Sequence, residues 1–134
     1  MTQKDKQLLL IDLCARLPYS VKCYPVITNG EPNTIGGYCE VLDDFYIREV
    51  GGWFPISMIK PFLRPMSNMT EEEKKEFCKI EGRLNFPCKH IKPTFSVDEF
   101  DWLNAHHFDY RGLIPKGLAL EAKEGMYNKK EGNI

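Results

Sequence analysis

The sequence predicts a single α+β domain in which a small, strongly bent antiparallel sheet is flanked by one helix before it and two short helices after it. Three observations indicate this fold class: an apolar stripe at helical spacing near the start, alternating apolar residues punctuated by turns in residues 19–66, and two capping boxes farther along. The 134 residues, 43% hydrophobic and 28% charged, suit one globular domain with its own core. We assign residues 1–120 to this domain and expect residues 121–134 to form a frayed tail.

The first predicted helix covers residues 3–17. Thr2 and Asp5 have the spacing of a capping pair, and Pro18 ends the helix because the residue before a proline is driven out of the α region. The apolar face recurs at helical spacing in Leu10, Leu13, Cys14 and Leu17. We expect this helix to pack over an open edge or end of the sheet, and a partner-binding helix is the alternative.

Residues 19–66 are expected to form the sheet, because short runs of β-branched and aromatic residues alternate there with turn residues. The expected strands lie at 21–27 with an interruption at Pro25, at 38–42, at 45–50 and at 56–59, and the expected turns at 28–33, 43–44 and 51–52. Tight connections between such short strands favour a sheet that closes into a small SH3-like barrel. Residues 60–65, with two prolines, are expected to lead out of the sheet.

The two later helices are predicted at residues 71–80 and 97–107. Each starts at a capping box, in which a hydroxyl and a glutamate three residues later bond each other's backbone N–H groups: Thr70 with Glu73, and Ser96 with Glu99. Residues 82–94, with prolines and no periodicity, are expected to be a loop. Trp102 lies in the middle of the second helix and is expected to be the central core residue of the C-terminal half.

Composition and charge predict a cytoplasmic protein. The longest apolar run, Leu8 to Ile11, is too short to cross a membrane or to form the core of a signal peptide. The five cysteines are odd in number and contain no C-x-x-C pair, so we expect free thiols in a reducing compartment. The net charge of −1 provides no overall attraction for nucleic acid or anionic lipid.

His106 and His107 stand in a segment that crowds aromatic, acidic and basic side chains together, and polar groups among aromatics must be paired or functional. Adjacent residues at a helix end point about 100° apart, so we expect the two histidines not to share a metal ion. An enzyme site near residues 106–111, in which a histidine meets Asp109 and a nucleophile, is an alternative hypothesis.

Arg111 is expected to pair with the carboxylate of Asp101 or Asp109, which would fix the irregular segment against the preceding helix. An exposed Arg111 would instead be able to bind a phosphate or a carboxylate of a partner.

Trp53 and Phe54 follow two glycines at an expected turn. An aromatic pair in such a place is typical of an exposed binding platform of a small barrel, although half-buried plugs at a barrel end have the same pattern. Residues 29–55 carry five acids against one arginine, a balance of −4, which favours a basic or proline-rich partner over nucleic acid.

A basic segment at residues 79–93 supports a second function class. Its charge balance is +3, since a single acid, Glu81, stands against four cations: Lys79, Arg83, Lys89 and Lys92. The alternative hypothesis is therefore a small nucleic-acid-binding protein, with Phe86 or Trp102 as a stacking surface.

Four stretches of the chain, residues 13–19, 60–73, 101–114 and 116–122, resemble a family of small uncharacterised proteins of gut Bacteroidales bacteria and their bacteriophages. Members commonly have a glycine where Ser20 stands and an acid where Pro115 stands. The resemblance implies an accessory product of a phage or mobile element, and it carries no activity to any residue.

We therefore expect a non-catalytic accessory protein that binds another macromolecule without a cofactor or a metal, with a host or phage protein as the partner. The partner-binding residues are expected to be Trp53, Phe54, His107, Asp109, Tyr110 and Arg111.

Overall fold

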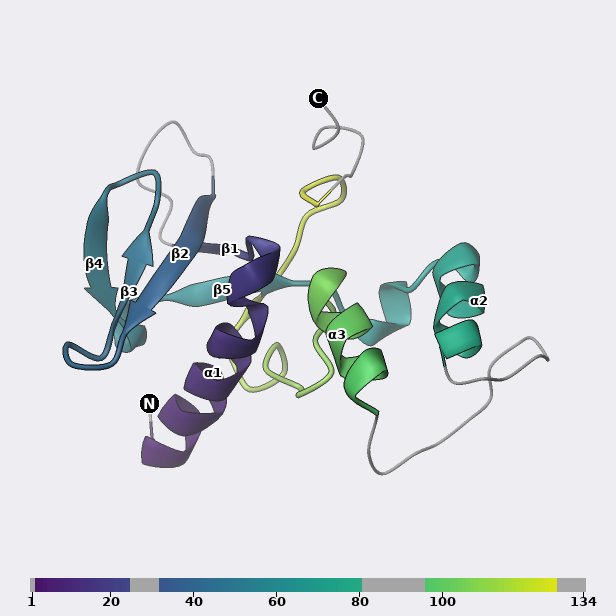
Figure 1. Cartoon of the computed structure of the whole chain (residues 1–134), viewed down its shortest axis with the longest axis horizontal. Coiled ribbons are helices and arrows are strands. Elements are labelled where there is room, and N and C mark those ends of the chain that lie inside the picture. Colours follow the sequence, from purple (N-terminus) through teal and green to yellow (C-terminus); the bar gives the residue numbers. More distant parts are fainter. Residues whose placement is uncertain (1, 25–31, 81–95, 128–134) are drawn as a thin grey trace.

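The structure is a computed structural model that describes residues 2–24, 32–80 and 96–127. Within these ranges one mixed sheet of six strands accompanies three α-helices, which confirms the α+β class. The helices are α1 (Gln3–Arg16), α2 (Glu71–Ile80) and α3 (Val97–Ala105). The strands are β1 (Lys22–Tyr24), β2 (Asn33–Cys39), β3 (Asp44–Ile47), β4 (Gly52–Pro55), β5 (Lys60–Leu63) and β6 (Leu120–Glu121). Figure 1 shows β2, β3 and β4 toward one end of the long axis and α2 toward the other.

The strands lie in the order β4-β3-β2-β1-β5-β6. Neighbouring strands are antiparallel except β5 and β6, which run parallel. The expected closure into an SH3-like barrel does not occur, because β5 takes its outer partner from the C-terminal segment instead of pairing with β4. The sheet therefore stays open, and β4 is an edge strand.

Several segments of the sheet differ from their predicted structure. β2 is Asn33–Cys39 and not 38–42, and β3 is Asp44–Ile47 and not 45–50. Gly52–Pro55, expected to lie at a turn, is strand β4. Ile56–Met58, expected as part of a strand, is a 3-10 turn, whereas Lys60–Leu63, expected to lead out of the sheet, is β5. Pro61 lies opposite Cys23 of β1, which is compatible with a strand because a proline removes only its own N–H donor.

The N-terminal helix begins and ends close to the predicted positions. The Thr2 hydroxyl accepts a hydrogen bond from the backbone N–H of Asp5 at 3.0 Å. The helix ends at Arg16, and a 3-10 turn over Leu17–Tyr19 follows. Ser20 then has φ of +56°, in the left-handed region that glycine adopts most readily.

The main core lies between α1 and one face of the sheet. Leu9 and Leu13 of α1 are buried together with residues of β2 and β3, so the helix packs against the sheet as a structural element. The fully buried members of this core are Leu9, Leu13, Val21, Cys23, Ile35, Phe45, Ile47, Ile59, Leu63 and Leu113.

The two later helices begin at capping boxes, as predicted: Thr70 with Glu73, and Ser96 with Glu99. Helix α3 ends at Ala105, earlier than predicted, because His107 takes φ of +64°. The N–H of Phe108 donates to Leu103 O at 3.0 Å and the N–H of His107 to Asn104 O at 3.1 Å, which is the Schellman pattern of helix ends.

A smaller core between α2 and α3 contains Phe77, Leu103 and Phe108. Trp102, expected at its centre, is only half-buried, and its indole N–H donates to a Glu76 carboxylate oxygen at 2.9 Å. Phe108 is fully buried and takes the central position, so the prediction for Trp102 is wrong.

The expectation of a frayed tail does not hold for residues 121–127. Glu121 pairs with Leu63 of β5, and the Tyr127 hydroxyl hydrogen-bonds to the backbone of β1 and of β5. A long-range partner of this kind leaves no local pattern in the sequence. Residues 128–134 lie outside the described ranges.

Cys14, Cys23 and Cys39 are free thiols, as expected, whereas Cys78 is disulfide-bonded. Cys88 lies outside the described ranges. None of the helices described is long and apolar enough to cross a membrane.

Candidate functional site

The first candidate region surrounds residues 106–111, and a buried ion pair lies at its base. The side chains of Asp12 and Arg16, one turn apart on α1, are both 0% exposed, and their Nε–Oδ2 distance is 2.7 Å. Arg16 Nη2 also donates to Asp12 Oδ1 at 3.0 Å and to the Phe108 carbonyl at 2.6 Å. Buried charges require pairing, so these contacts fix α1 to the segment that follows α3. The third guanidinium nitrogen of Arg16, Nη1, is buried and has no hydrogen-bond partner among the described residues.

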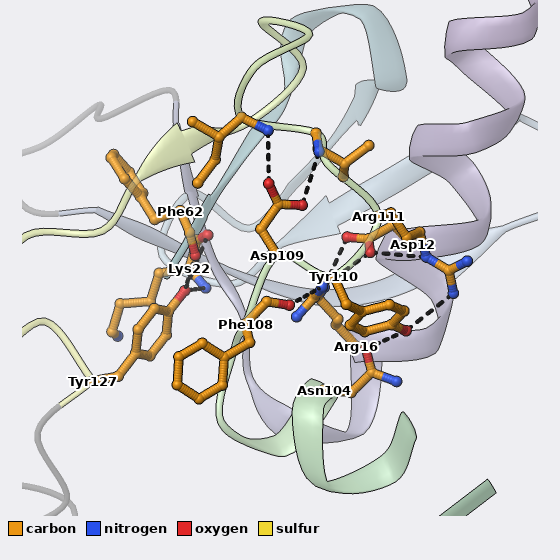
Figure 2. A network of polar contacts seen from close by, with 12 residues as sticks. Asp12, Arg16, Lys22, Phe62, Asn104, Phe108, Asp109, Tyr110, Arg111 and Tyr127 are labelled. Carbon is orange, nitrogen blue, oxygen red and sulfur yellow. Dashed lines mark hydrogen bonds and ion pairs between the residues drawn. The ribbon is translucent and has the colours of Figure 1, made fainter. Parts of the chain in front are cut away.

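Arg111 joins the same carboxylate. Its Nε donates to Asp12 Oδ1 at 3.1 Å and its Nη2 to the Tyr110 hydroxyl at 3.1 Å, while that hydroxyl donates to Asn104 Oδ1 at 2.9 Å, as Figure 2 shows. The guanidinium groups of Arg16 and Arg111 lie 5.3 and 4.9 Å from the Tyr110 ring centre, within cation–π range. The Asp12 carboxylate thus pairs with both Arg16 and Arg111.

Asp109 holds the loop that follows it. Its two carboxylate oxygens accept the backbone N–H groups of Leu113 at 2.8 Å and Ile114 at 2.9 Å. The prediction that Asp101 or Asp109 pairs with Arg111 is therefore wrong, because Arg111 reaches across 99 residues to Asp12.

His107 is buried against the C-terminal segment. Its ring stacks on the Tyr127 ring with 3.6 Å between centroids. Burial, together with the nearby charge of Arg16, lowers the pKa of His107 to about 3. The imidazole is therefore neutral at pH 7 and is not presented to a partner.

His106 faces a different set of groups from its neighbour. Its ring stacks on Trp102 at 4.1 Å, and its two nitrogens lie 3.7 Å from carboxylate oxygens of Glu73 and Glu76. The divergence expected for adjacent residues at a helix end is confirmed.

These contacts give residues 106–111 a structural role. The enzyme hypothesis needs a histidine, Asp109 and a nucleophile in one cleft, but both Asp109 oxygens bond backbone amides and His107 stacks on Tyr127. Within the described ranges, no group of three or more His, Cys, Asp or Glu side chains could hold a metal ion. A shallow depression of about 420 Å³ beside this segment includes Asp109 and Glu121 in its lining.

The basic segment proposed for nucleic acid is described only at its start. Lys79 is exposed in the last turn of α2. Arg83, Lys89 and Lys92 lie outside the described ranges, as does Phe86.

The second candidate region is the side of β2, β3 and β4 that faces away from the main core. Trp53 of β4 pairs with Tyr46 of β3, and their rings meet edge to face at 5.2 Å. Asp44 and Pro55, also paired, lie two residues from Tyr46 and Trp53 and so share their side of the sheet. We call these four residues, Asp44, Tyr46, Trp53 and Pro55, the outer sheet face.

Trp53 and Phe54 do not form one platform, because successive residues of a strand point to opposite faces. Phe54 packs against the main core, while Trp53 is 45% exposed. The partner of Trp53 is Tyr46, which the sequence analysis missed. Recognition of residues 44–55 as a hairpin would have found it, since pairing Ile47 with Gly52 places Tyr46 opposite Trp53.

Gly36 of β2 leaves room for the side chains of Tyr46 and Arg48. Gly36 lies between the register pairs of Ile35 and Gly37, at a bulge. A Cβ at Gly36 would come within 2.9 Å of Arg48 Cγ and 3.4 Å of Tyr46 Cδ2. The absence of a side chain there lets Tyr46 and Arg48 lie close to the sheet.

Exposed apolar residues concentrate around this hairpin. Of the eight large hydrophobic side chains that are exposed in the described residues, five lie between positions 41 and 58: Val41, Leu42, Val50, Trp53 and Met58. Among the described residues, Trp53 is the member of this group that belongs to the outer sheet face, while Val41, Leu42 and Val50 lie in the turns at either end of β3.

No family model, curated protein or solved structure matches this chain.

Proposed function

We propose that this protein is a non-catalytic accessory protein of a phage or mobile element that binds another protein, of the host or the phage, through the outer sheet face. The observation that carries the proposal is the exposed Trp53 on edge strand β4, packed edge to face against Tyr46. Tryptophan and tyrosine supply a large share of the energy of protein interfaces, and their burial on binding is favourable. The cytoplasm is the proposed compartment because Cys14, Cys23 and Cys39 are free thiols, while the disulfide at Cys78 is an argument against a reducing compartment.

The charge around this hairpin supports a protein partner over nucleic acid. Residues 32–55 contain four acids, Glu40, Asp43, Asp44 and Glu49, against the single cation Arg48, a balance of −3. Such a surface repels a phosphate backbone.

The 106–111 segment is not part of the proposed surface. His107 and Asp109 are buried, and Tyr110 and Arg111 are bonded within the network around Asp12. Substitution of a residue in this segment would change binding by lowering the stability of the fold and not by removing a contact with the partner.

The test compares proteins captured by wild-type and variant chains from cells of the natural host, measured by quantitative mass spectrometry. Trp53→Ala is expected to reduce recovery of the specific partner at least tenfold. Tyr24→Ala is the matched control, because Tyr24 is similarly exposed, at 49%, but lies on β1. Equal recovery with Trp53→Ala and wild type would exclude the outer sheet face as the binding surface.

A further inference from the structure

We infer that the outer sheet face recognises a cationic side chain, an arginine or lysine of an extended partner segment, held over Trp53 and beside Asp44. This inference rests on the proposed function and specifies the chemistry of its partner.

The first step concerns the two aromatic rings. The face of an indole or phenol ring is electron-rich and attracts cations within about 6 Å. Among the described residues, the cation–π contacts lie at Tyr110 and Phe108, with none at Trp53. The Trp53 ring is therefore open to a cation from outside the part of the chain that is described.

The second step concerns the carboxylate of Asp44. Asp44 is diagonal to Trp53 across the β3–β4 pair, a separation that long side chains can bridge. Two of the neighbouring acids are already engaged: Asp43 pairs with Lys6 at 3.0 Å, and Glu49 accepts hydrogen bonds from Thr34. Asp44 has no ion-pair partner among the residues described. It can therefore complement a cation that packs on Trp53.

The third step concerns direction along the strands. Along the chain, Arg48 follows Tyr46 by two residues and Asp44 precedes it by two. The Arg48 side chain lies near Gly36, as Tyr46 does. The face is therefore acidic at its Asp44 end and basic at its Arg48 end, which places a partner's cation at the Asp44 end. Alternate side chains of an extended segment are about 7 Å apart, the same spacing as that between Asp44 and Tyr46 along β3. Alternate side chains of an extended partner segment would therefore have the same spacing as the side chains of the outer sheet face.

The test is selection from a displayed library of random linear dodecapeptides on the wild-type chain, with counter-selection on Trp53→Ala. Enriched peptides are expected to share an arginine or lysine, and Asp44→Asn should weaken their binding at least tenfold. Asp98→Asn removes the same charge at an exposed position of α3 and should leave their affinity within twofold.

The outcomes separate the two claims. Trp53-dependent peptides that lack a common cation, or that bind Asp44→Asn as tightly as wild type, would overturn the inference and leave the proposed function standing. A selection that yields no Trp53-dependent peptide would count against both.

Discussion

The hydroxyl of Tyr127 accepts a hydrogen bond from the backbone N–H of Lys22 at 2.8 Å, across 105 residues of sequence. The same hydroxyl donates to the Phe62 carbonyl at 2.7 Å. Cys23 lies opposite Pro61 in the β1–β5 pair, so Lys22 and Phe62 would form the next pair. The phenol therefore replaces a ladder hydrogen bond between the two strands. Burial raises the pKa of Tyr127, which keeps the hydroxyl protonated as a donor.

Tyr127→Phe is expected to lower the free energy of unfolding by about 1–3 kcal/mol, because the Lys22 N–H and the Phe62 carbonyl lose their partner. Urea denaturation measures the change. Tyr24→Phe removes a hydroxyl from an exposed tyrosine of β1 and should alter stability by less than about 0.5 kcal/mol. Equal midpoints for the two variants would show that the C-terminal segment contributes little to the fold.

Asp12→Asn is expected to cost about 3–5 kcal/mol, because it leaves the buried Arg16 and the adjacent Arg111 without their carboxylate. The measurement is again chemical denaturation at pH 7. Glu40→Gln, which removes the same charge at an exposed turn, should leave the midpoint unchanged. A loss for Asp12→Asn as small as that of the control would contradict the central place given to this carboxylate.

We expect the free energy of unfolding to decrease as the pH is lowered below 6.5, because of His107. Its pKa is about 3 in the folded protein and about 6.5 when unfolded, so below pH 6.5 only the unfolded state binds the proton. The contribution is fully present above pH 6.5 and is lost at about 1.4 kcal/mol per pH unit as the pH falls toward 3. Measurements between pH 6.5 and 5 avoid most carboxylate titration.

His107→Asn isolates this effect, since asparagine tolerates the positive φ at this position and does not titrate. The variant is expected to be less stable at pH 7.5, where it lacks the ring stacked on Tyr127, and to show a flatter slope below pH 6.5. An unchanged slope would assign the pH dependence to other groups.

Phe108→Ala is expected to cost about 3–5 kcal/mol, and Trp102→Ala less, because Phe108 is fully buried while Trp102 lies at the rim of the smaller core. Thermal denaturation of both variants gives the order. The reverse order would restore Trp102 to the centre of this core.

Local signals in the sequence predicted the helices well. The three caps at Thr2, Thr70 and Ser96 each depend on residues within four positions, and all three form. The end of α3 was missed because no local rule predicts a histidine in the left-handed region. His107 lies there with its ring stacked on Tyr127, twenty positions away.

Long-range pairing was the part that could not be predicted. The parallel pairing of β5 with β6 and the contact of Asp12 with Arg111 join segments far apart in the chain, and neither leaves a period or a motif. Trp53 was recognised as a candidate from its composition and place. Its separation from Phe54 and its pairing with Tyr46 depend on strand register, which is decided by the whole hairpin.

The claim that the outer sheet face binds a protein is tested most directly by photocrosslinking in cells of the natural host. A photoreactive amino acid replaces Trp53 in one variant and Tyr24 in another, since both positions are similarly exposed on different strands. We expect a discrete covalent adduct with one protein from position 53 and none from position 24. No adduct at position 53, or the same adduct from both positions, would contradict the proposed binding surface.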